Sequence, residues 1–177
     1  MEGEEKYVGW VRSLGRNGLL HLWGQVKDGE NLEPWPQGKA FEYLVLRAFE
    51  LDGARVIWPY RSEWEQVDGV VYVDGLSCLI ECKHWREPVD FGPIAKLKVR
   101  VDRRPLPVIG LLFSVSGFTG PAWEEFQSQP LRNLLLWRRS DVDRALKHGM
   151  RTALGIKWRQ AVEEAVMDYE LEEEDFR

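Results

Sequence analysis

Strand-length apolar runs alternate with helix-length segments in the second half of this sequence. Val108–Phe113 and Leu134–Trp137 are almost wholly apolar, which is typical of strands buried on both faces of a sheet. Phe91–Asp102, a basic segment, precedes the first run, and a segment with Pro121 in its first turn separates the two. Both segments are predicted helices. The alternation predicts an α/β protein with helices on both faces of its sheet.

A β-hairpin is predicted in the middle of the chain. Val67–Val73 is rich in Val and Tyr, Asp74-Gly75 is a turn signal, and Ser77–Lys83 is the returning strand. A shorter strand is expected at Arg55–Trp58, where it ends before a proline. With the two later runs, these segments predict a central mixed sheet of about five strands.

Helices are expected at both ends of the chain as well. Residues 6–27 are predicted to be helical with a break near two glycines, and apolar spacing predicts a helix over Gly38–Leu51. Ser140 is expected to cap a helix that ends at Lys147, and an amphipathic helix is expected from about Leu154 to Tyr169. We expect an N-terminal helical extension (1–37), a central domain (38–150), and a C-terminal helix with an acidic tail (151–177).

Charge is distributed unevenly along the 177 residues. The net charge is −5, but residues 163–177 hold eight acids and one base, so the remainder is slightly basic. Between Lys83 and Arg104 there are seven bases and three acids. This stretch is either a solvated helix face or a surface for a polyanion. The tail is interpreted as a solubilising end or a partner contact, with shielding of the basic stretch as the alternative.

Cysteine spacing and the chain start indicate a cytoplasmic protein without a membrane partner. On one strand, Cys78 and Cys82 would have α-carbons ~13 Å apart, too far for a disulfide or a shared zinc, so both are expected in the core. Two unpaired cysteines suit a reducing compartment. The acidic start does not resemble a secretion signal, and no apolar run is long enough to cross a bilayer.

Charged residues on a buried strand mark the candidate site. Glu81 and Lys83 point to the same face of the predicted strand, ~6.6 Å apart along it. Burying unpaired charge is costly, so these side chains need partners. Hairpin pairing brings Asp68 towards Glu81, and Glu42 can add a third carboxylate from the first helix of the central domain. The alternatives are a surface ion pair for Glu81 and Lys83, a turn role for Asp68, and a helix-dipole role for Glu42.

Carboxylates grouped beside a lysine suit Mg²⁺ or Mn²⁺, which prefer oxygen ligands and can activate a water molecule for attack on a phosphate. Lys83 would position that water or neutralise charge in the transition state. The basic helix would hold the backbone of a polyanion. The residues expected to contact nucleic acid are Lys96, Lys98, Arg100, Arg103 and Arg104.

Asp68 followed by Glu81-x-Lys83 behind an apolar strand resembles the signature of the PD-(D/E)xK nuclease superfamily, and the surrounding sequence is similar to the Mrr-type restriction endonuclease catalytic domain. The resemblance spans about Gly38 to Lys147. It is carried by Gly38-Lys39-Ala40-Phe41-Glu42, Val67-Asp68-Gly69-Val70, Ile80-Glu81-Cys82-Lys83-His84-Trp85 and Ser116-Gly117-Phe118-Thr119. Val67 stands where the family motif has a proline.

This resemblance implies a restriction-endonuclease-like fold and metal-dependent cleavage of DNA phosphodiesters in restriction, defence or repair. It implies that Asp68, Glu81, Glu42 and the Cys82 carbonyl bind the metal and that Lys83 assists the water, which makes Asp68, Glu81, Lys83 and Glu42 the catalytic set.

Two other functions remain open at this stage. One is a catalytically inactive protein that uses the same fold as a DNA-binding or assembly subunit, within a homodimer or a larger complex. An aromatic ring or a bound arginine in the site would favour this alternative. The other is a nuclease for RNA or branched DNA.

Overall fold

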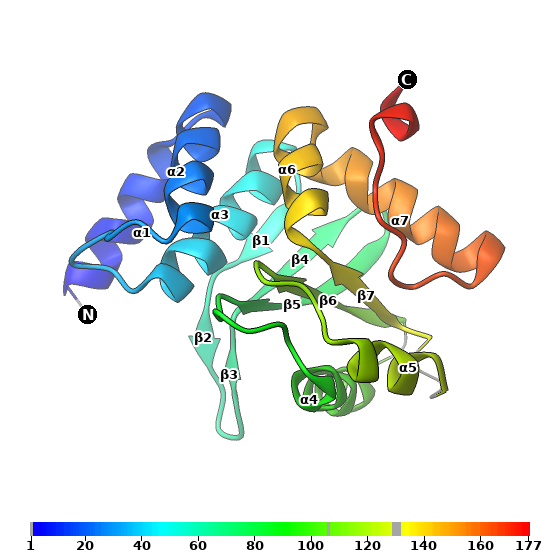
Figure 1. Cartoon of the computed structure of the whole chain (residues 1–177). Helices are drawn as coiled ribbons and strands as arrows, with labels where there is room; N and C mark the ends of the chain where they lie inside the picture. The colour runs from blue at the N-terminus through cyan, green and yellow to red at the C-terminus, as the bar shows by residue number, and fades with distance from the viewer. Residues whose placement is uncertain (1, 106, 129–131) are drawn as a thin grey trace.

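The computed structural model describes residues 2–105, 107–128 and 132–177, and a five-stranded mixed sheet forms its centre (Figure 1). The strand order is β1-β4-β5-β6-β7. The antiparallel part comprises β1 (Arg55–Ile57), β4 (Gly69–Val73) and β5 (Leu76–Lys83). The parallel part continues from β5 to β6 (Val108–Ser114) and β7 (Leu134–Trp137). The mixed α/β sheet predicted from the sequence is confirmed.

Helices cover both faces of this sheet, as Figure 1 shows. One face packs against α4 (Phe91–Asp102) and α5 (Gly120–Ser128), and the other against α3 (Gln37–Leu51), α6 (Arg139–His148) and α7 (Met150–Glu164). The alternation along β5 explains this division. Its residues Cys78, Ile80 and Cys82 enter the core on the α3 side, whereas Leu79 enters the core on the α4 side.

Both cysteines are buried and free, as predicted. No helix within the described ranges combines the length and apolarity that a membrane crossing requires.

The predicted strand Val67–Val73 is interrupted at Asp68. β2 (Tyr60–Arg61) and β3 (Gln66–Val67) form a separate two-stranded sheet that projects beside α4 (Figure 1). Gly69 then begins β4, and close packing requires a glycine there: a Cβ would lie 2.5 Å from Cδ2 of Leu46 and 3.2 Å from the carbonyl oxygen of Ile57. The change of sheet therefore occurs at the residue that the sequence marked as a candidate ligand.

The C-terminal segment differs from the prediction. α7 ends at Glu164 instead of Tyr169, because Ala165 adopts the left-handed conformation with φ 57°. The chain then returns across α6 and α7, buries Leu171 completely, and ends in the short helix η1 (Glu173–Phe176). Figure 1 shows this tail on the side of the sheet away from α4, so it does not cover the basic helix.

The N-terminal cap of α6 also differs from the prediction. The N-cap residue is Arg138 and not Ser140, and Asp141, in the first turn, supplies the capping hydrogen bond: its Oδ2 accepts from the backbone N–H of Arg138 at 2.7 Å. Ser140 instead donates a hydrogen bond to Glu170 in the returning tail at 2.5 Å.

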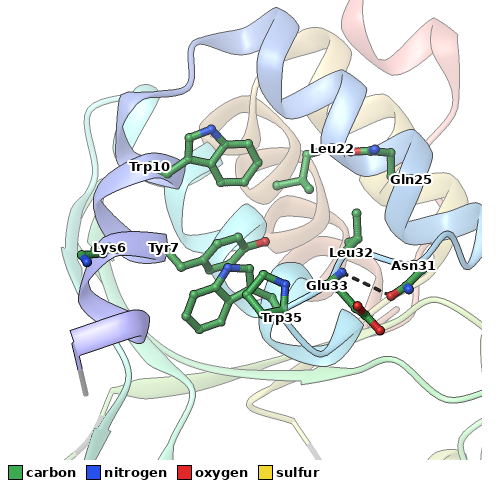
Figure 2. A pocket seen from close by; sticks show the side chains of 10 residues that line it. Lys6, Tyr7, Trp10, Leu22, Gln25, Asn31, Leu32, Glu33 and Trp35 are labelled. Carbon is green, nitrogen blue, oxygen red and sulfur yellow. Dashed lines mark hydrogen bonds between the residues drawn. The ribbon is translucent and has the colours of Figure 1, made fainter.

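The N-terminal residues form α1 (Glu2–Ser13) and α2 (Arg16–Asp28), with the predicted break between them. Tyr7 stacks on Trp35 with ring centroids 4.5 Å apart, and both line a cavity of about 470 Å³ together with Trp10 (Figure 2). The Tyr7 hydroxyl is buried without a hydrogen-bond partner among the described residues, and burial raises the pKa of Tyr7 to about 12. The division at residues 37 and 150 stays a prediction.

Candidate active site

Asp68 is fixed in the interior by the strand that carries the other candidate residues. The Gly69–Ile80 register between β4 and β5 places Asp68 next to the Glu81 end of β5. Asp68 is buried, with 9% of its surface exposed, and its Oδ2 accepts a hydrogen bond from the backbone N–H of Cys82 at 3.0 Å. The turn interpretation of Asp68 does not account for this burial, because a solvated turn residue needs no partner on a neighbouring strand.

Glu81 lies between two cations. Its Oε1 is 2.6 Å from Nζ of Lys83, and its Oε2 accepts a hydrogen bond from Nη1 of Arg100 at 2.5 Å. Glu81 is 7% exposed, so these contacts offset the cost of burying its charge. Glu81 and Lys83 are therefore not an exposed surface pair. Arg100, predicted as a nucleic-acid contact, instead reaches from α4 into the candidate site.

Glu42 adds a third carboxylate from the second turn of α3. Its Oε2 is 2.9 Å from Nζ of Lys39. Burial and the nearby charge of Asp68, with a smaller effect of Glu81, raise the pKa of Glu42 to about 7. Burial and Glu81 likewise raise the pKa of Asp68. Glu42 and Asp68 are therefore both harder to ionise than a solvated carboxyl group, and additional positive charge beside them would favour their charged forms.

The donor chemistry fits a divalent cation, because carboxylate oxygens are ligands that Mg²⁺ prefers in proteins. Within the described ranges, however, no three His, Cys, Asp or Glu side chains form a ready-made ligand group. The contacts explain why: Lys39 engages Glu42, while Lys83 and Arg100 engage both oxygens of Glu81. The predicted role of the Cys82 carbonyl stays a prediction.

The five predicted nucleic-acid contacts separate into two groups. Lys98 pairs with Asp102, and Arg100 and Arg104 both pair with Glu65. Lys96 and Arg103 are exposed and pair with no acid in the described part of the chain. Of the five, Lys96 on α4 and Arg103 at its C-cap are therefore the cations most available to a polyanion.

Sequence reasoning missed Trp64 and Glu65. Trp64, at the tip of the β2–β3 hairpin, has 81% of its surface exposed, and Glu65 binds two arginines of the α4 segment. The sequence did carry a signal for an exposed Trp64: the tryptophan stands between two acids, Glu63 and Glu65, and has no apolar neighbour that would predict burial.

A family model described as "Restriction endonuclease", of the Mrr catalytic type, matches residues 36–146. The match covers more than half of the chain and includes α3, the central sheet, α4 and the four predicted catalytic residues. Compared with curated proteins, the chain gives no match. The restriction-endonuclease-like fold that the sequence resemblance implied is confirmed.

Proposed function

The chain belongs to the family of Mrr-type restriction endonuclease catalytic domains, and on this basis we propose that it is a divalent-metal-dependent DNA endonuclease. The family supports a nuclease of the restriction type, and domains of this kind generally use divalent metals. Our proposal adds DNA as the substrate, Mg²⁺ or Mn²⁺ as the ion, and a role in restriction, defence or repair.

The observation that carries the proposal is that Asp68 and Glu81 are buried and that burial, together with their charges, raises the pKa of Glu42. Asp68 comes from the β3–β4 junction, Glu81 from β5 and Glu42 from α3, and Lys83 lies 2.6 Å from Glu81. A structural role explains these residues poorly, because burial and a neighbouring carboxylate raise the pKa of both Glu42 and Asp68, a shift that a bound divalent cation would oppose.

Each residue has a defined task in this proposal. A divalent cation, when bound, would polarise the phosphate and acidify the attacking water. Asp68 and Glu81 would hold it, Glu42 would complete the carboxylate set, and the Cys82 N–H would keep Asp68 oriented. Lys83 would orient the water and stabilise negative charge on the phosphate oxygens. Arg100 would leave Glu81 and contact the phosphate that enters.

Plasmid cleavage tests the proposal. Supercoiled plasmid is incubated with the wild-type chain, Asp68→Asn or Lys83→Ala, with Mg²⁺, with Mn²⁺, or with EDTA. We expect wild-type cleavage only with metal, and a loss of at least about 100-fold in each variant, the size typical for removing a transition-state contact. Asp74→Asn is the control, because Asp74 is an exposed acid of the same hairpin. Equal cleavage by all four chains would refute the proposal.

Arg100 favours a second candidate function. Because its guanidinium occupies Glu81, the same fold is also suited to a DNA-binding or assembly subunit without catalysis, alone or as a homodimer. In that case the wild-type chain would bind DNA without metal, cleave no plasmid under any condition, and retain its DNA affinity in Asp68→Asn.

A further inference from the structure

We propose that the groove between Trp64 and α4 binds one unpaired DNA nucleotide, with the base stacked on Trp64 and the phosphate held by Lys96 and Arg103. This inference rests on the proposed function in taking DNA as the ligand, and it adds the class of DNA: strands with unpaired bases. It requires neither metal nor cleavage.

Trp64 is presented to solvent by an ordered turn. The Ser62 hydroxyl oxygen accepts hydrogen bonds from the backbone N–H groups of Trp64 at 3.4 Å and Glu65 at 3.1 Å. The Ser62 N–H donates to the Glu65 carbonyl at 2.9 Å, which closes the turn. Among the large apolar side chains described, Trp64 has the greatest exposed fraction, 81%. This exposed indole is available as a flat apolar surface on which an unpaired base can stack.

The groove beside Trp64 has the size and lining of a nucleotide site. Its volume is about 360 Å³. Val99 of α4, with 51% of its surface exposed, gives an apolar wall next to the indole. The lining residues are Trp64, Glu65, Ala95, Lys96, Val99, Arg100 and Arg103.

The charge of the groove is suited to a phosphate. Its single acid, Glu65, is already paired with Arg100 at 3.2 Å and with Arg104. Lys96 and Arg103 have no acidic partner in the part of the chain that the structure describes, so their charges remain for a ligand. Cations that follow a backbone beside an aromatic platform are the usual features of single-stranded nucleic-acid sites.

The exposed indole of Trp64 favours unpaired DNA over duplex DNA. A base within a duplex is stacked on both faces and cannot offer either face to an indole, whereas an unpaired base can. Arg100 connects this groove to the candidate active site, because it lines the groove and also contacts Glu81. A nucleotide bound in the groove therefore leads its neighbouring phosphate towards the carboxylates.

Fluorescence anisotropy of labelled DNA, with the full chain in EDTA, tests the inference. The probes are a single-stranded oligonucleotide of about 15 nucleotides and the same sequence as a duplex. We expect Trp64→Ala to weaken single-strand binding at least about tenfold and duplex binding less than about threefold, as loss of one stacked base implies. Trp64→Phe should retain most of the affinity, because a phenyl ring still stacks.

Trp10→Ala is the matched control, since Trp10 is 46% exposed on α1, a helix that does not line this groove. Equal losses on single strand and duplex, or no loss in Trp64→Ala, would overturn the inference. Tighter, Trp64-dependent binding of an RNA strand of the same sequence would overturn the choice of DNA. Failure of plasmid cleavage alone leaves this binding difference intact, so the two proposals fail separately.

Discussion

The backbone N–H of Cys82 and the carboxylate of Asp68 are joined by a 3.0 Å hydrogen bond. This bond links the junction between the two-stranded sheet and the central sheet to β5, the strand that carries Glu81 and Lys83. It also separates two properties of Asp68, because an acceptor atom at this position is needed for folding, whereas a negative charge is needed only for the proposed chemistry.

Replacing Asp68 by Asn or by Ala should therefore give different results. Asn keeps an oxygen that can accept from Cys82, so Asp68→Asn should remain as stable as the wild type or become more stable, while losing cleavage. Asp68→Ala leaves a buried N–H without a partner and should lower the free energy of unfolding by about 1–3 kcal/mol. Urea denaturation of both variants provides the measurement, and equal stability would contradict this role of the hydrogen bond.

Removing Arg100 should strengthen metal binding. Arg100 holds one oxygen of Glu81, so Arg100→Gln should free that oxygen and lower the dissociation constant for Mg²⁺ or Mn²⁺ by about tenfold, the equivalent of one hydrogen bond to a charged group. Isothermal titration of the DNA-free chain measures the constant. Arg103→Gln serves as the control on the same helix segment, and an equal change in both variants would argue against displacement of Arg100.

Glu42 should make stability depend on pH in the absence of metal. Its pKa is about 7 in the folded chain and lower in the unfolded chain, so between about pH 4.5 and 7 the folded state binds more protons. The free energy of unfolding from this group therefore falls as pH rises through that window. Glutamine cannot ionise, so the free energy of unfolding of Glu42→Gln should not fall with pH in this way. At pH 8 the variant should be more stable than the wild type by about 1–3 kcal/mol.

Glu50 on the same helix provides a control of opposite sign for the Glu42 variant. Arg47 and Arg12 lower the pKa of Glu50, so its contribution to stability is present at neutral pH and is lost as pH falls through the folded pKa. Glu50→Gln should destabilise the chain at pH 8 and have little effect at low pH. Thermal melts from about pH 2 to 8 compare the two variants, because the Glu50 contribution changes only below its unfolded pKa of 4.5. A Glu42→Gln difference that is constant between pH 4.5 and 8, or a Glu50→Gln difference that persists at the lowest pH, would contradict the corresponding assignment.

The acidic tail should support the fold instead of competing for the basic helix. Leu171 is fully buried, and its backbone N–H donates to Oδ1 of the buried Asp141 at 2.8 Å. Leu171→Ala should lower the free energy of unfolding by about 2–4 kcal/mol without changing DNA affinity at low salt. Val162→Ala, at a position 65% exposed, should change neither. Tighter DNA binding in Leu171→Ala would restore the shielding hypothesis.

The sequence predicted the central sheet well because apolar patterning and turn chemistry are local signals. Phe91–Asp102 and Leu134–Trp137 were predicted with the bounds that the structure has. The predicted end of α7 at Tyr169 was wrong, because the helix stops where Ala165 turns left-handed. That conformation depends on where the returning chain packs, and no local sequence pattern encodes it. Ser140 with Asp143 three residues later is a local capping pattern, but the helix begins one residue before Ser140, and Asp141, buried beside Lys157, makes the capping hydrogen bond to Arg138 instead.

In the candidate site, too, local signals predicted some neighbours, whereas contacts that depend on tertiary packing were not predicted. Strand alternation and hairpin pairing were enough to place Asp68 near Glu81 and Lys83. The approach of Arg100 to Glu81 depends on how α4 lies across the sheet, and periodicity gives only which face of a helix is apolar. Trp64 and Glu65 lie in a short connection whose direction only the folded chain defines.

The interruption at Asp68 gives the molecule two parts that tolerate change differently. β3 pairs with β2 and not with the central sheet, whose register starts again at Gly69. Insertions or deletions between Arg61 and Gln66 can therefore alter what the hairpin tip presents, while the carboxylate of Asp68 keeps its bond to Cys82. Changes in this loop, whether natural or engineered, can therefore alter ligand preference and leave the carboxylates of the candidate site in position.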